Sequence, residues 1–131
     1  EALGRADAVS LHIPYTQETR HLMGRRAFAA LKPGALLVNC SRGETVDETA
    51  LVGALREGRL GGAGLDVFEG EIPPQDSPLL HLDGVLLSPH NAALSTEGSI
   101  RMATQAAQNV LDCLHGRLRP EVVFNRARLG L

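Results

Sequence analysis

The sequence predicts an α/β fold built on a parallel, doubly wound sheet. Short apolar runs that end in turn residues alternate with helical patterns along the chain, and this alternation is typical of parallel strands covered by helices. Loops that follow three of these runs each carry a charged or titratable side chain. The chain has 131 residues, of which 44% are hydrophobic, and is therefore long enough to bury a core.

Four apolar runs are expected to form buried strands, and they span residues 8–13, 35–39, 62–67 and 85–88. Pro14 ends the first run. The glycines at 61–64 open the third run, so they are not expected to bind phosphate. A phosphate-binding loop must open a helix, because backbone N–H groups at the helix start then face the anion.

Two short helices are expected between the strands. The first spans residues 25–31 and stops at a Pro-Gly turn. The second follows Asp47, which has the character of an N-cap, with Val46 and Leu51 placed as a hydrophobic staple. It is expected to end near Gly58.

The C-terminal part of the chain is expected to contain one long helix that begins near Ser95 or Thr96 and ends at Gly116. One face of this helix is apolar and carries Ile100, Ala103, Ala107, Val110, Leu111 and Leu114. This face is expected to dock on something other than the sheet. Residues 121–124 are expected to form an extended tail, and residues 1–6 resemble the end of a helix.

Composition argues against several classes of function. The formal net charge is −2 and no aromatic residues lie among the C-terminal arginines, which disfavours a nucleic-acid surface. Cys40 and Cys113 lack zinc-type spacing and the five histidines show no HExxH pattern, so no metal site is expected. No apolar run reaches membrane-spanning length. We therefore expect reduced thiols and a cytoplasmic protein without membrane or nucleic-acid partners.

Arg42, Glu71 and His90 are the candidate functional residues, because each lies in a loop after a predicted strand. In a parallel sheet these loops open on one edge, at the carboxyl ends of the strands, where ligands bind. A guanidinium can hold an anionic substrate through its planar fork. An imidazole beside a carboxylate can donate or accept one proton. Together the three residues indicate an acid/base site, with Glu69 as the alternative carboxylate.

These residues lie in motifs that resemble the C-terminal part of the D-isomer-specific 2-hydroxyacid dehydrogenase family, in particular its phosphoglycerate dehydrogenase-like members. The matching segments follow the family's order and are Leu11-His12-Ile13-Pro14, Lys32-Pro33-Gly34, Asn39 to Gly43 with Val46-Asp47-Glu48, Leu65-Asp66-Val67-Phe68 with Glu71, and Ser88-Pro89-His90. The resemblance implies that residues 1–94 form the second half of an NAD-binding Rossmann domain. It implies that residues 95–131 are a helix and tail that return to the substrate domain.

The resemblance also implies a function. The expected enzyme is an oxidoreductase that transfers a hydride between NAD, or alternatively NADP, and a D-2-hydroxy acid or 2-keto acid. Arg42 would bind the substrate, His90 would act as acid and base, and Glu71 rather than Glu69 would tune His90. A homodimer is expected for the full-length protein. The 131-residue chain alone is expected to be inactive, because the family's Gly-rich loop and the first part of its substrate domain lie upstream.

Ten residues are expected to contact the cofactor by resemblance, mostly through their backbone. They are Ile13, Pro14, Cys40, Ser41, Arg42, Asp66, His90, Asn91, Ala92 and Ala93. Among them, Asp66 is expected to face the nicotinamide ring and its carboxamide.

Two other functions are alternatives to this one. An NAD(H)-sensing binding protein or transcriptional corepressor on the same scaffold can keep all three candidate residues, so the sequence separates it from an enzyme only weakly. A hydrolase that used Ser88 or Ser41 with His90 and Asp66 is disfavoured, because the chain has no Gly-X-Ser-X-Gly elbow.

Overall fold

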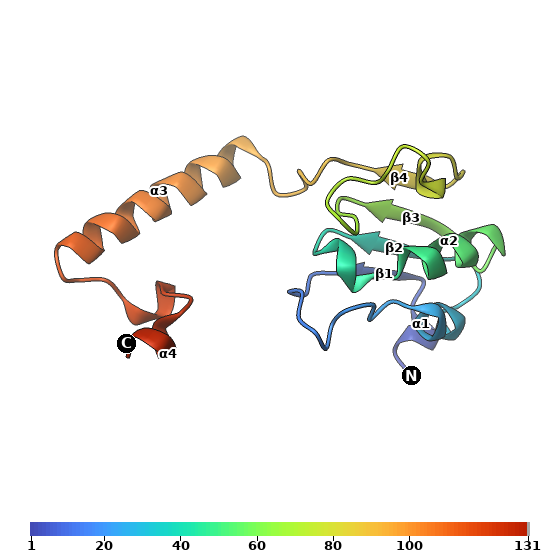
Figure 1. Ribbon diagram of the computed structural model, residues 1–131, viewed down its shortest axis with the longest axis horizontal. Helices are drawn as coiled ribbons and strands as arrows, with labels where there is room; N and C mark the ends of the chain where they lie inside the picture. Colours follow the sequence, from blue (N-terminus) through green and yellow to red (C-terminus); the bar gives the residue numbers. More distant parts are fainter. Residues whose placement is uncertain (131) are drawn as a thin grey trace. The chain divides into compact units, whose positions relative to one another are not determined.

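The computed structural model describes residues 1–130, which fall into two compact units, residues 1–92 and the residues from Ala93 onward. A sheet of four parallel strands in the order β1-β2-β3-β4 organises the first unit (Figure 1). The strands are β1 (Ala8–Leu11), β2 (Ala35–Asn39), β3 (Leu60–Leu65) and β4 (Val85–Leu87). The predicted α/β class with a parallel sheet is confirmed.

The carboxyl ends of the four strands lie in register. Leu11 at the end of β1 pairs with Asn39 at the end of β2, which pairs with Leu65 at the end of β3. Leu65 in turn pairs with Leu87, the last residue of β4. The loops that follow the strands therefore all leave from one edge of the sheet.

Two helices cover one face of this sheet. They are α1 (Arg25–Ala30) and α2 (Glu48–Arg56), and three 3₁₀ turns, η1 (Leu3–Arg5), η2 (Gly43–Thr45) and η3 (Pro78–Leu80), complete the unit. The core joins Phe28 of α1 and Leu51 of α2 to Leu37 of β2. Leu36 and Val38 alternate with the buried residues of β2 and are 48% and 37% exposed, so the opposite face is open in this unit.

The start of α2 agrees with the expectation. The Asp47 side chain accepts a hydrogen bond of 2.9 Å from the N–H of Ala50, which confirms it as the N-cap. Val46 and Leu51, the expected staple pair, are both buried in the core. Gly58 follows the helix with φ +66°, a conformation that favours glycine.

Strand β3 begins two residues earlier than expected and ends at Leu65. Gly61, inside this strand, has no Cβ, and a Cβ there would lie 2.5 Å from the carbonyl oxygen of Gly34. Because glycine has no side chain, Gly61 can approach Gly34 closely, and the pairing of β3 with β2 can begin at Leu60. The expectation that the 61–64 glycines belong to a strand is confirmed.

The second unit contains α3 (Thr96–Leu114), η4 (Pro120–Val122) and α4 (Arg126–Leu129). Ser95 caps α3 by accepting a hydrogen bond of 2.9 Å from the N–H of Gly98, as expected. The expectation of an extended tail at 121–124 is wrong. Pro120 presets a helical φ at the start of a turn, so η4 forms there instead. Across residues 1–130, none of the helices combines the length and the apolar character needed to cross a membrane.

Candidate active site

Arg42, Glu71 and His90 all lie beyond the in-register ends of the strands. Arg42 is three residues past the end of β2, Glu71 is six past β3, and His90 is three past β4. All three side chains are exposed at this edge of the sheet. Parallel pairing therefore places the three predicted residues on the loops of one edge, as the sequence indicated.

Two buried polar side chains form hydrogen bonds with the backbone at Arg42. Asn39 Nδ2 donates to the carbonyl oxygen of Arg42 at 3.0 Å, and Thr45 Oγ1 donates to the same oxygen at 2.6 Å. Asn39 Oδ1 also accepts from the N–H and the hydroxyl of Ser41, at 3.0 and 2.8 Å. Asn39 and Thr45 are fully buried, so their hydrogen bonds fix the loop while the Arg42 side chain faces outward.

Glu71 ends a tight turn that packs against the Arg42 loop. The N–H of Glu71 donates to the carbonyl oxygen of Phe68 at 3.2 Å, and Gly70 within the turn has φ +77°. Gly43 lies directly against this turn, because a Cβ built on it would be 1.9 Å from the Phe68 carbonyl oxygen. The loops that carry Arg42 and Glu71 are therefore in backbone contact.

Asp66 anchors the loop that carries His90. It is 3% exposed and follows β3, and its carboxylate accepts hydrogen bonds from three groups of the loop after β4. Ser88 Oγ and the N–H of Asn91 (2.9 Å) donate to Oδ1, and the N–H of Ala92 (2.9 Å) donates to Oδ2. These donors lie on both sides of His90, so Asp66 determines where that residue sits.

The pKa of Asp66 reflects this arrangement. Burial alone would raise the pKa, but the hydrogen bonds from Ser88, Ala92 and Asn91, together with the nearby charge of His90, hold it below its ordinary value of 3.8. The carboxylate is therefore ionised in the folded chain at neutral pH.

Asp66→Asn in the full-length protein should lower the free energy of unfolding by about 2 kcal/mol at neutral pH, because an amide N–H₂ would face a backbone N–H donor. Since the folded-state pKa lies below 3.8, the carboxylate's contribution is complete above about pH 4 and is lost as the pH falls through that lower pKa. The wild type should therefore lose more stability than the variant on acidification.

Urea unfolding between neutral and acidic pH measures this difference, with Asp83→Asn at an exposed position as the matched control. Parallel stability curves for the wild type and Asp66→Asn would contradict the assignment.

The backbone itself is unusual at the candidate residues. Within residues 1–130, the non-glycine residues with positive φ are His21 (51°), Glu71 (72°) and His90 (54°). Such conformations cost free energy and occur where the surrounding structure imposes them, often at functional sites. Two of the three predicted catalytic residues are among them.

The structure does not join the three candidates directly. Among the described residues no hydrogen bond or ion pair links Arg42, Glu71 or His90 to one another. The hydroxyl of Ser41 donates to Asn39 and that of Ser88 donates to Asp66, so neither is paired with His90 as a hydrolase would require.

Of the residues expected to contact a cofactor, those in the first unit lie in the loops at the same edge. Ile13 and Pro14 follow β1, while Cys40 and Ser41 follow β2. The N–H groups of Asn91 and Ala92, two residues expected to contact the cofactor, donate to Asp66 in this structure. Ala93 belongs to the second unit.

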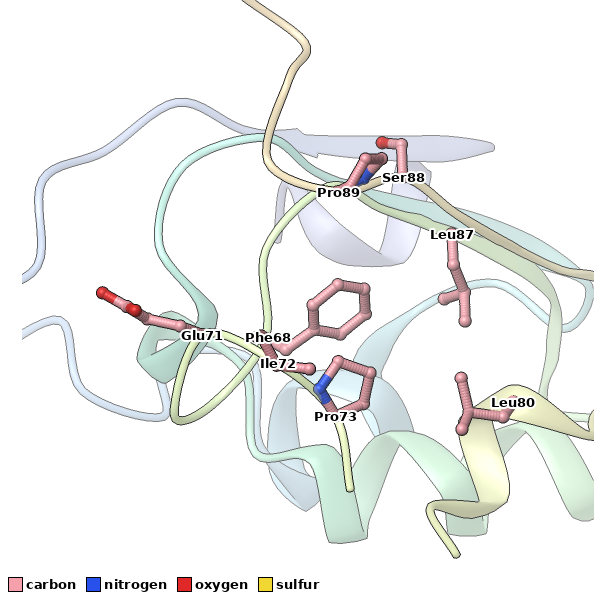
Figure 2. Close-up of a pocket in the computed structure, with 8 residues that line it drawn as sticks. All are labelled: Phe68, Glu71, Ile72, Pro73, Leu80, Leu87, Ser88 and Pro89. Atoms are coloured by element: carbon pink, nitrogen blue, oxygen red, sulfur yellow. The ribbon is translucent and has the colours of Figure 1, made fainter. Parts of the chain in front are cut away.

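A cavity of about 390 Å³ lies beside the Glu71 turn. Its lining is mainly apolar and comprises Phe68, Glu71, Ile72, Pro73, Leu80, Leu87, Ser88 and Pro89. Figure 2 shows Phe68, Leu80 and Leu87 around the space, whereas the Glu71 carboxylate points away from it. The cavity is therefore not the place where the charged candidates meet.

Sequence reasoning missed the residues that hold the site together. Asn39 and Thr45 were not singled out, although an asparagine that ends an apolar strand is a signal that could have identified one of them. The sequence also gives no signal that His21 and Glu69 meet, yet the Nε2 atom of His21 contacts the carboxylate of Glu69. His12 is exposed and hydrogen-bonds Ser10 at 2.7 Å.

Comparison with known proteins identifies the family of this chain. Residues 1–92 match the model of the D-isomer specific 2-hydroxyacid dehydrogenase NAD binding domain. A glyoxylate reductase of Korarchaeum cryptofilum is 48% identical over 121 residues, which are 92% of this chain and 36% of that protein. A D-3-phosphoglycerate dehydrogenase of Methanocaldococcus jannaschii is 46% identical over 94% of this chain and 23% of its own length.

The fold is shared with a solved structure, a D-isomer specific 2-hydroxyacid dehydrogenase of Lactobacillus delbrueckii ssp. bulgaricus in its NAD complexed form. It superposes with a TM-score of 0.85 at 33% identity, over 94% of this chain and 41% of that one. The chain thus spans between about a quarter and two fifths of the length of these relatives. By these matches the chain belongs to the D-isomer specific 2-hydroxyacid dehydrogenase family, and residues 1–92 correspond to its NAD binding domain.

Proposed function

We propose that the full-length protein is an NAD(P)-dependent oxidoreductase that interconverts a D-2-hydroxy acid and its 2-keto acid. In this proposal the present chain supplies Arg42 to bind the substrate, His90 as acid and base, and Glu71 to tune His90. The observation that carries it is the in-register carboxyl edge, where the loops of all three residues leave the sheet. The left-handed backbone of Glu71 and His90 adds support.

Arg42 is suited to bind a carboxylate. Within residues 1–130 its guanidinium donates one hydrogen bond, from Nη1 to the Ser41 carbonyl oxygen at 2.6 Å. The other N–H groups can therefore form the bidentate contact that a substrate carboxylate and keto oxygen accept. Because Asn39 and Thr45 already fix the backbone at Arg42, little backbone conformational entropy is lost when substrate binds.

His90 would donate a proton to the keto oxygen during reduction and take it from the hydroxyl during oxidation. The Glu71 carboxylate would favour the protonated imidazole and orient it. The two side chains are not hydrogen-bonded here, and catalytic contacts often tighten only when substrate is bound.

The residues at the sheet edge fit the nicotinamide end of a cofactor. Asp66 Oδ2 accepts one hydrogen bond among the described residues, and a carboxylate oxygen can accept two, so it could also receive a carboxamide N–H. Backbone at Ile13, Pro14, Cys40 and Ser41 would line the same edge. When bound, the cofactor supplies or accepts the hydride.

The relatives favour an enzyme over a sensor. Those named above are a reductase and two dehydrogenases, so the corepressor alternative gains no support. Glyoxylate is the first substrate to test, because one of these relatives is a glyoxylate reductase. Oxidation of NADH or NADPH by the full-length protein with glyoxylate or other 2-keto acids tests the proposal, and absence of turnover with the whole series would reject it.

Three further features are part of the proposal. Residues 95–131 return to the substrate domain of the full-length protein, and light scattering of that protein should show a homodimer. A cytoplasmic location is the third feature.

Arg42→Lys in the full-length protein should lower kcat/KM for the 2-keto acid by a factor on the order of 10², or about 2.7 kcal/mol. Lysine keeps the charge but loses the planar fork, so both substrate binding and transition-state stabilisation suffer. Steady-state kinetics measure the effect. Arg56→Lys, at an exposed position in the last turn of α2, is the matched control. Equal kinetic constants for Arg42→Lys and the wild type would show that the Arg42 guanidinium does not bind the substrate in the proposed way.

A further inference from the structure

Three side chains outside the candidate site converge on the turn that carries Glu71. They are His21, Glu69 and Glu48, and we refer to them as the clasp. The Nε2 atom of His21 contacts the carboxylate of Glu69, and each side chain is only about one-third exposed, at 35% and 37%. Glu48 Oε1 accepts a hydrogen bond of 2.8 Å from the backbone N–H of Glu69.

Backbone hydrogen bonds hold His21 in place. Its N–H donates to the carbonyl oxygen of Glu44 at 2.8 Å, and its own φ is +51°. Two residues later, the N–H of Met23 donates to Thr45 O at 3.0 Å, and Met23 O accepts from Asp47 at 3.1 Å. The segment after β1 is thereby joined to the loop that follows Arg42, and His21 has little freedom to move.

Glu48 is fixed as well, because it lies in the first turn of α2. Burial raises the pKa of Glu48, the charge of Glu69 raises it further, and the hydrogen bond from the Glu69 N–H opposes both. Glu69 is therefore bound at two points, its side chain by His21 and its backbone by Glu48.

We propose that His21 and Glu48 are positioning residues that hold the Phe68–Glu71 turn, through Glu69, at a fixed distance from the Arg42 loop. The proposal rests on the proposed role of Glu71 at the site. Glu69 then has a structural role, because its carboxylate contacts His21, and Glu71 is the glutamate of this turn that acts at the site. Among the described residues neither His21 nor Glu48 forms a hydrogen bond or ion pair with Glu71, Arg42 or His90, so we assign their effect to the backbone of the turn.

Glu48→Ala in the full-length protein should lower kcat for 2-keto acid reduction by about tenfold to 10²-fold with KM nearly unchanged, because small displacements of a catalytic group have effects of this size. Glu48→Gln retains an oxygen that can accept the Glu69 N–H and should restore most of kcat. Amide hydrogen exchange at Glu69 should be faster in Glu48→Ala and close to wild type in Glu48→Gln.

The pair His21 and Glu69 is tested by a double-mutant cycle on kcat. His21→Ala and Glu69→Ala should lower kcat by similar factors, and the double variant should be no worse than either single variant. A loss for Glu69→Ala far beyond that for His21→Ala would show that Glu69 acts at the reacting atoms, and would overturn the proposal.

Glu71→Gln separates this proposal from the proposed function. If Glu71→Gln lowers kcat while Glu48→Ala and His21→Ala keep the wild-type value, the clasp is dispensable and only the positioning proposal fails. If Glu71→Gln itself keeps the wild-type kcat, the role of Glu71 fails, and the positioning proposal fails with it. Unchanged hydrogen exchange at Glu69 in Glu48→Ala would also overturn the clasp, whatever the kinetics.

Discussion

His90→Ala should lower kcat/KM for 2-keto acid reduction by the full-length protein by roughly 10²–10⁴, because the variant lacks the group that donates a proton to the keto oxygen. Cofactor affinity should be largely retained, since the proposed cofactor contacts of this loop are mostly backbone. Asp66 holds that backbone through its bonds to Ser88, Asn91 and Ala92, and none of these bonds uses the imidazole. The loop should therefore keep its place when the side chain is removed.

Steady-state kinetics and a titration with NADH, followed by fluorescence, together test this expectation. His81→Ala is the matched control, because His81 is an exposed histidine of the same unit that follows η3 and precedes β4, whereas His90 follows that strand. A His90→Ala enzyme that reduces 2-keto acids at the wild-type rate would exclude His90 as the acid. Loss of NADH binding in the same variant would show instead that the imidazole holds the cofactor.

The local pattern of the sequence was sufficient to predict the layers of the fold. Apolar runs closed by turn residues gave four strands, and the N-cap at Asp47 gave the start of α2. These features are encoded over a few residues, so a single sequence displays them. Parallel topology alone was enough to predict that the loops of Arg42, Glu71 and His90 lie at the same edge of the sheet.

The supports of the site could not be predicted in the same way. His21 and Glu69 are 48 residues apart, and no local pattern links an imidazole in one loop to a carboxylate in another. Asp66 was expected to face a cofactor, whereas most of its hydrogen bonding is used by the His90 loop. A buried carboxylate at a strand end signals that partners exist, but only the folded chain shows which groups they are.

The backbone conformations were equally hidden. Glu71 and His90 adopt left-handed φ values, which their residue types do not require. The extended conformation expected at residues 121–124 is wrong for a similar reason, because Pro120 starts a helical turn ahead of this short apolar run. Short segments carry too little periodicity to distinguish the two conformations.

Gly43→Ala should lower the free energy of unfolding by about 3 kcal/mol or more and should reduce kcat and raise KM together. A Cβ on residue 43 would lie 1.9 Å from the carbonyl oxygen of Phe68 and 2.5 Å from the backbone nitrogen of Glu69. Both atoms belong to backbone that hydrogen bonds hold in place, since the Glu69 N–H is bound by Glu48 and the Phe68 oxygen by the Glu71 N–H. The turn would therefore have to move away from the Arg42 loop.

The reason for glycine here is close approach and not conformational freedom, because Gly43 is not among the glycines with positive φ. Gly53→Ala is the matched control: it lies inside α2, its added Cβ meets nothing within 4 Å, and alanine should stabilise the helix by about 0.5–1 kcal/mol. Urea unfolding and steady-state kinetics of both variants test the pair. Opposite signs of the stability change would support the contact between the two loops, because the substitution is chemically identical at the two sites. A Gly43→Ala protein as stable and active as the wild type would mean that the Arg42 and Glu71 loops do not need this contact to form the site.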